Sequence, residues 1–130
     1  MHRSLLLVFA LCFVVYSAGA QTAAPLPTVT GFDCPTYPQK AESMRLQGMV
    51  QMEVTTDGHQ VTHVKVLPSH PVLAEEAGKN VRTWRFAEHT PTSFVVKYFY
   101  VNEGRYKKDP VTNCSAKMDL PAKVTVSTRF

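Results

Sequence analysis

The stretch from Gln47 to Phe86 constrains the fold more than any other part of the sequence. Residues 49–56 alternate apolar and polar side chains, which is the period of a strand with one buried and one exposed face. Asp57-Gly58 follows, a pair that tolerates the positive φ of a hairpin turn, and the alternation resumes over residues 61–67. The pattern predicts a β-hairpin.

An amphipathic helix is predicted directly after the hairpin. Pro71 suits the first turn of a helix, where the N–H that proline lacks would have no partner. Apolar residues then recur at helical spacing: Leu73, Ala77, Val81 and Trp84. This stripe predicts a helix that ends at the only tryptophan and packs against the hairpin. We interpret Trp84 as a core anchor rather than as part of a binding site.

The strongest strand signal lies in residues 93–101, which are β-branched or aromatic nearly throughout. The preceding helix must carry the chain back along the sheet, so this strand is expected to pair antiparallel with residues 49–56 and to form an edge. An edge strand exposes unpaired N–H and C=O groups that can capture an extended peptide. The predicted partner-binding residues are Ser93, Phe94, Val95, Val96, Lys97, Tyr98, Phe99, Tyr100 and Val101.

Taken in order, these segments resemble the C-terminal domain of the energy transducer TonB. The matching pieces are Tyr37-Pro38, Ala41, Gln47-Gly48, Val50, Val54, Asp57-Gly58, Val61, Val64, Val66 and Trp84-Arg85-Phe86. The resemblance covers roughly Cys34 to Val101. It implies an α+β domain of αββαβ order in two layers, with a three-stranded antiparallel sheet and two helices on one face. It also implies work by protein–protein contact, since receptor peptides add to the sheet of TonB in the region of its third strand.

The start of the chain has the pattern of a secretory signal peptide over residues 1–20. A short basic start precedes an apolar core, and Ala18-Gly19-Ala20 supplies the small residues of a cleavage site. An uncleaved inner-membrane anchor is the alternative, but the apolar run is shorter than the roughly 20 residues of a spanning helix. We interpret residues 21–33 as a flexible lead-in and residues 34–108 as the TonB-like domain. The expected location is periplasmic or secreted.

Residues 109–130 form a C-terminal extension beyond the resemblance. Val124 and Val126 alternate with polar residues there, which is typical of an additional strand. If that strand pairs with residues 93–101, the predicted binding edge is already occupied. A disordered tail is the alternative.

Two cysteines, Cys34 and Cys114, remain after removal of the signal peptide, and they flank the predicted folded region. In a secreted chain this arrangement predicts one disulfide bond, which would tie the entry to the first helix to the segment after the third strand. Two free thiols are the alternative.

The residue pattern does not favour a catalytic or a metal site. His59 and His63 lie about 13 Å apart if both are in one strand, too far to share an ion. The sequence has 14 basic and 10 acidic residues, well mixed apart from the basic group at 105–108, so it does not predict a nucleic-acid interface. No catalytic residue, metal ligand or cofactor is predicted.

The sequence therefore predicts a non-enzymatic protein-interaction module of TonB type. The expected partner is a TonB-dependent outer-membrane receptor, a related periplasmic protein or a second copy of the chain. A role in transport or in energy transduction stays open. The alternatives are a structural homodimer formed through edge strands and a small secreted metal-binding or catalytic protein.

Overall fold

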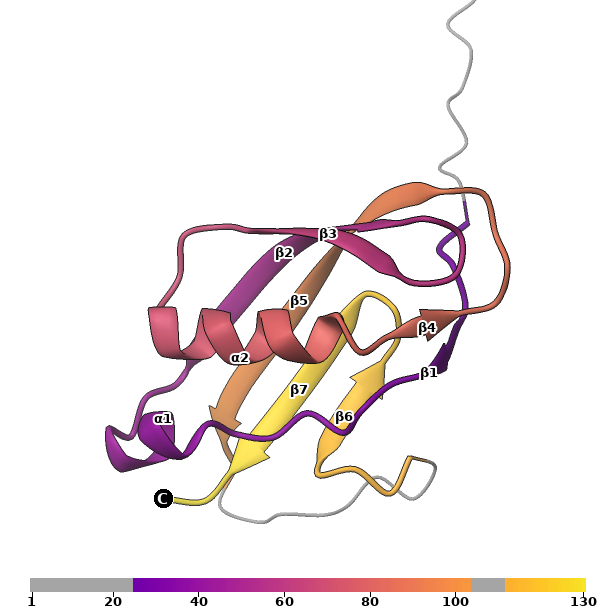
Figure 1. The fold of residues 1–130 in the computed structure, drawn as a ribbon. Helices are drawn as coiled ribbons and strands as arrows, with labels where there is room; N and C mark the ends of the chain where they lie inside the picture. Colours follow the sequence, from indigo (N-terminus) through magenta and orange to yellow (C-terminus); the bar gives the residue numbers. More distant parts are fainter. Residues whose placement is uncertain (1–24, 104–111) are drawn as a thin grey trace, which may run out of the picture.

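The computed structural model describes residues 25–103 and 112–130 (Figure 1). The elements in chain order are β1 (Val29–Gly31), α1 (Gln39–Ser43), β2 (Gly48–Thr56), β3 (Val61–Val66), α2 (Pro71–Val81), β4 (Arg85–Phe86), β5 (Thr92–Asn102), β6 (Ala116–Asp119) and β7 (Lys123–Thr128). The predicted signal peptide lies outside the described residues.

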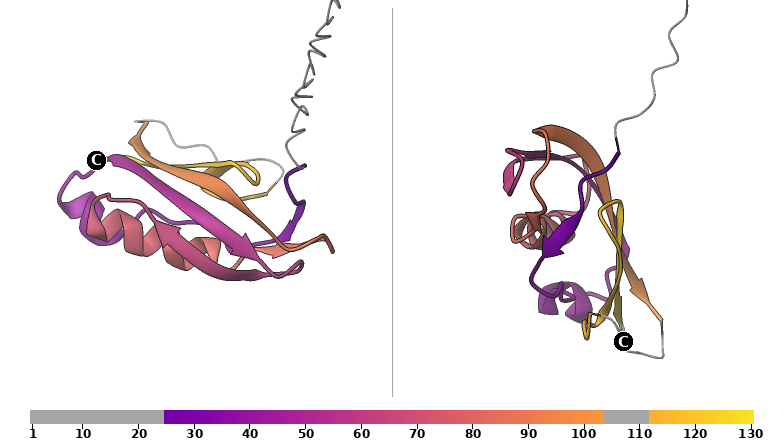
Figure 2. Two further views of the ribbon diagram at one scale, coloured as in Figure 1. Left: turned by 90° about the horizontal axis from the view of Figure 1, so that it is seen from above. Right: turned by 90° about the vertical axis from the view of Figure 1, so that its right-hand side faces the viewer.

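The main sheet has five strands in the order β3-β2-β5-β7-β6 (Figure 1). β5 and β7 pair in parallel, and the other neighbours pair antiparallel. Both helices lie on the same side of this sheet (Figure 2). The predicted two-layer α+β class is confirmed. The predicted three-stranded antiparallel sheet is wrong in extent, because the C-terminal extension adds two strands.

The turn between β2 and β3 has the predicted conformation. Gly58 adopts a φ of 106°, a backbone conformation that residues with a Cβ rarely adopt. One carboxylate oxygen of Asp57 accepts hydrogen bonds from the backbone N–H groups of His59 and Gln60, at 2.9 Å each. These two donors stabilise the charged carboxylate and hold the pKa of Asp57 below its usual range. The predicted hairpin is confirmed.

Helix α2 begins at Pro71 as predicted, but it ends at Val81, before Trp84. The N–H groups of Thr83 and Trp84 bond to carbonyls three residues back, so the last turn tightens and the chain leaves the helix. Trp84 is fully buried and stacks on Tyr98 with ring centroids 6.3 Å apart. The helix end predicted at Trp84 is therefore wrong by one turn, whereas the core role of the residue is confirmed.

The hydrophobic core lies between the helices and the sheet. Its largest fully buried side chains are Trp84, Tyr98, Tyr100, Met52 and Leu73. They come from α2, from the turn after it and from the two central strands. β2 and β5 each place every second side chain in this core. The side chains between them therefore lie on the face of the sheet opposite the helices.

The lead-in predicted for residues 21–33 is structured over its second half. Val29–Gly31 forms β1, which pairs antiparallel with β4. Pro27 is buried, and the N–H of Ala87 donates to the carbonyl of Thr28 at 2.9 Å. The prediction of a flexible segment is wrong there, because β4 supplies the backbone partners that a free segment would lack.

Candidate partner-binding strand

Strand β5 lies inside the sheet rather than at its edge. On one side it pairs with β2 along nine residue pairs. On the other side, Lys97–Asn102 pairs in parallel with β7. The predicted edge strand over residues 93–101 is therefore wrong from Lys97 onward, because the C-terminal extension folds back onto it. The additional strand predicted around Val124 and Val126 is confirmed as β7.

Within the predicted binding stretch, residues 93–96 have no described strand beside them on the side away from β2. We call them the open segment. The N–H of Lys97 points to this outer side, where it donates to the carbonyl of Ala122 at 2.9 Å. Backbone groups alternate in direction along a strand, so the N–H groups of Ser93 and Val95 point the same way. The open segment therefore presents backbone groups to an additional strand.

The predicted contact residues divide into two sets. Four of them are buried in the core: Phe94, Val96, Tyr98 and Tyr100. The others lie on the sheet face opposite the helices: Ser93, Val95, Lys97, Phe99 and Val101. Val95 is 46% exposed, and the ammonium of Lys123 lies 5.0 Å from the ring centroid of Phe99, within cation–π range. Only this second set can offer side chains to a partner.

A buried hydrogen-bond chain holds β5 against the helix layer. The hydroxyl of Tyr98 donates to the side-chain oxygen of Asn80 at 2.6 Å. The side-chain nitrogen of Asn80 donates to the carbonyl of Asp33 at 2.9 Å. Burial raises the pKa of Tyr98 and that of Tyr100, so both phenols stay protonated in alkaline as well as in neutral solution.

Asn80 is a structural residue that the sequence reasoning missed. It lies three residues after Ala77, on the apolar stripe of α2, and it is only 8% exposed. A lone amide at such a position was the available signal, because buried polar groups need hydrogen-bond partners.

A cavity of about 310 Å³ lies at the start of β5, lined by Pro25, His89, Thr90, Pro91 and Thr92. Both ring nitrogens of His89 are engaged. Nδ1 lies 2.8 Å from the carbonyl oxygen of Ala87, and Nε2 lies 2.6 Å from the hydroxyl of Thr56. In the neutral ring, Nδ1–H donates to the carbonyl and the Thr56 hydroxyl donates to Nε2.

Within residues 25–103 and 112–130, His, Cys, Asp and Glu form no group of three suited to a metal ion.

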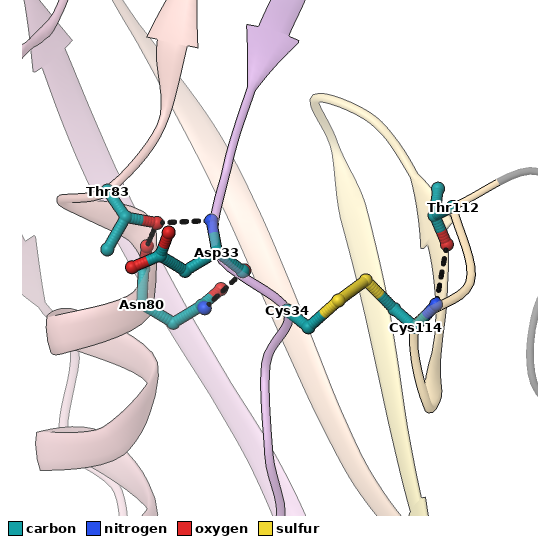
Figure 3. Close-up of a disulfide and its surroundings, with 6 residues drawn as sticks. All are labelled: Asp33, Cys34, Asn80, Thr83, Thr112 and Cys114. Atoms are coloured by element: carbon teal, nitrogen blue, oxygen red, sulfur yellow. Dashed lines mark hydrogen bonds between the residues drawn. A yellow bond between two sulfur atoms is a disulfide. The ribbon is translucent and has the colours of Figure 1, made fainter.

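The predicted disulfide between Cys34 and Cys114 is confirmed (Figure 3). Their Cα atoms lie 5.3 Å apart, and the two residues are 80 positions apart in the sequence. Cys34 belongs to the segment between β1 and α1, and Cys114 precedes β6. The bond therefore joins the helix layer to the C-terminal extension.

These features define a small two-layer α+β domain in which the open segment of β5 has no described strand on one side. The chain belongs to the family of Gram-negative bacterial TonB protein C-terminal domains, which matches residues 33–102. The solution NMR structure of the Pseudomonas aeruginosa TonB C-terminal domain is similar, with a TM-score of 0.52 and 23% sequence identity. That match covers 60% of this chain and 88% of the other, and it shows the fold. A search of curated proteins found no match.

Domains of this family are periplasmic, non-enzymatic modules that interact with outer-membrane receptors and other proteins. The family match ends at Asn102, so β6 and β7 lie beyond it. Among the described residues, no helix has the length and apolar character needed to cross a membrane.

Proposed function

We propose that this protein is a periplasmic partner-binding module that takes an extended segment of another protein as an additional strand on β5. The observation that carries the proposal is the open segment, which presents unpaired backbone groups on the strand that the TonB resemblance assigns to peptide binding. Such backbone pairing is sequence-tolerant, and the side chains beside it provide selectivity.

The surroundings of the open segment fit an extended peptide. The exposed side chain of Val95 offers an apolar contact on the outer face of the sheet. The cavity beside Thr92 gives the peptide space to continue past the start of the strand. At the other end, the turn before β7 places Ala122 next to Lys97 and limits the pairing to a few residues. We therefore expect weak binding, because only a few backbone hydrogen bonds to the peptide can form.

The substitution Val95→Pro tests the proposal directly. The Val95 N–H points away from β2, so proline removes an outer donor without breaking a bond to β2. Proline at Val96 would instead break the β2–β5 ladder. Val66→Pro is the matched control on β3, because the N–H of Leu67 bonds to Gln51 and that of Val66 therefore points away from β2.

The measurement is affinity capture from a periplasmic extract with the unmodified protein and both proline variants, after circular dichroism has confirmed that each is folded. We expect Val95→Pro to lose a captured protein that Val66→Pro retains. Hydrogen exchange should then show the Val95 amide protected when that protein is added. Equal capture by all three proteins would overturn strand addition at β5. Light scattering identifies a second copy of the chain as the partner.

A further inference from the structure

Strands β6 and β7 form a C-terminal hairpin, residues 116–128, that occupies the outer side of β5. β7 pairs with Lys97–Asn102, and its side chains Val124 and Val126 are buried in the core. The hairpin follows the last residue matched by the TonB family. The hairpin covers Lys97–Asn102, the part of β5 that directly follows the open segment.

The disulfide connects this hairpin to a segment that is fixed elsewhere. Beside Cys34, the N–H of Asp33 donates to the Thr83 hydroxyl at 3.0 Å, and the carbonyl of Asp33 accepts from Asn80 (Figure 3). These bonds hold the Cys34 side on α2. The Cys114 side leads directly into β6. Within the described residues, the disulfide is the covalent crosslink between the helix layer and the hairpin.

The other contacts at the C-terminal end of the hairpin are noncovalent. The Thr128 hydroxyl donates to the Glu42 carboxylate at 2.6 Å, and the Ser127 hydroxyl donates to the Glu103 carboxylate at 3.0 Å. The ring of Phe130 contacts Tyr37 edge-on, with centroids 6.0 Å apart. Without the disulfide, these contacts, the β5–β7 pairing and the buried valines hold the hairpin, and such units open reversibly.

We propose that the Cys34–Cys114 disulfide is a redox latch that keeps the hairpin on β5, and that a thiol–disulfide oxidoreductase with a reduced dithiol releases it. This proposal rests on the proposed function, because it describes how the same binding strand is covered and uncovered. In the oxidised protein a partner strand reaches only the open segment. In the reduced protein the outer N–H groups of Lys97, Phe99 and Val101 become available as well.

The exchange chemistry favours attack at Cys34. Cys34 is exposed, whereas Cys114 is only 2% exposed, and a cavity of about 220 Å³ lies beside Cys34. A thiolate of the reductant attacks Sγ of Cys34, and Cys114 leaves as a thiolate that takes up a proton. The second thiol of the reductant then attacks the mixed disulfide. Cys34 is released as a thiol, and the reductant leaves as its own disulfide.

Hydrogen exchange of the whole protein, before and after reduction with dithiothreitol, tests the latch. We expect the amides of Lys97, Phe99 and Val101 to exchange at least about tenfold faster after reduction. The amides of Val96 and Tyr98 point towards β2 and should be accelerated less than the outer amides. The double variant Cys34→Ser, Cys114→Ser should show the reduced pattern without reductant and should not respond to it.

Unchanged exchange at the outer amides would overturn the latch. Acceleration at the outer amides that is no larger than that in β2 and β3 would also overturn it, because the outer amides would then exchange only when the whole domain unfolds. Binding of the captured partner separates the two proposals. A partner insensitive to Val95→Pro overturns the proposed function alone, since the exchange data involve no partner. A partner sensitive to Val95→Pro that binds equally in both redox states overturns the latch alone.

Discussion

Among the glycines that the structure describes, Gly58 leaves the least room for a side chain. Its φ of 106° lies in the region that favours glycine, and a Cβ built there would approach the carbonyl oxygen of His89 to 2.6 Å. The carbonyl belongs to the backbone and cannot move without shifting the loop before β5. Gly58 therefore couples the turn of the hairpin to the loop before the candidate binding strand.

We expect Gly58→Ala to destabilise the protein by about 2 kcal/mol or more, because it adds a disfavoured φ to a backbone clash. Gly31→Ala is the control, since a Cβ there would meet only the Cβ of Arg85 at 3.8 Å, an ordinary contact. Urea unfolding of the two variants measures the difference. Equal stabilities would show that the loop at His89 moves to make room for the Cβ without a loss of stability.

At the scale of elements, Asn80 joins three parts of the chain. It sits on α2, receives a hydrogen bond from Tyr98 of β5 and donates to Asp33, next to the disulfide. Strands and helices that pack only through apolar surface can slide, whereas a satisfied buried amide specifies one relative position. Together with the bond from the Asp33 N–H to Thr83, this amide fixes the segment that carries Cys34.

Asn80→Ala should lower the free energy of unfolding by about 2–3 kcal/mol, because it leaves the Asp33 carbonyl and the Tyr98 hydroxyl without their partner. Tyr98→Phe removes only one of the two bonds and should cost less. Thr36→Ala removes an exposed hydrogen bond to Glu76 from the same segment and should change stability by less than about 0.5 kcal/mol. Chemical denaturation ranks the three variants, and a Thr36→Ala loss as large as that of Asn80→Ala would contradict this account.

For the whole molecule, the disulfide closes most of the described chain into one loop. Replacing both cysteines by serine should cost about 4 kcal/mol, since a crosslink over 80 residues restricts the unfolded chain strongly. The variant should remain folded at 25 °C, because the other buried side chains are retained. Unfolding of the oxidised protein, the reduced protein and the double variant measures this. Identical midpoints for the oxidised and the reduced protein would refute the expectation.

Much of the fold followed from local pattern. The β2–β3 hairpin, the start of α2 and the β5 strand were predicted, because turn chemistry and apolar periodicity act over a few residues. The end of α2 and the existence of β1 were not predicted. β1 depends on pairing with β4, and the end of α2 depends on the turn that leads into β4. Signal-peptide cleavage at Ala20 stays a prediction.

The candidate site shows the same division. The sequence alone determined that residues 93–101 are a strand, that residues 123–128 are capable of being one, and that Cys34 and Cys114 are a plausible pair. Only the tertiary structure decided that β7 lies beside β5 and leaves residues 93–96 uncovered. Alternation specifies which face of a strand is buried, but the choice of neighbour depends on packing between segments more than twenty residues apart.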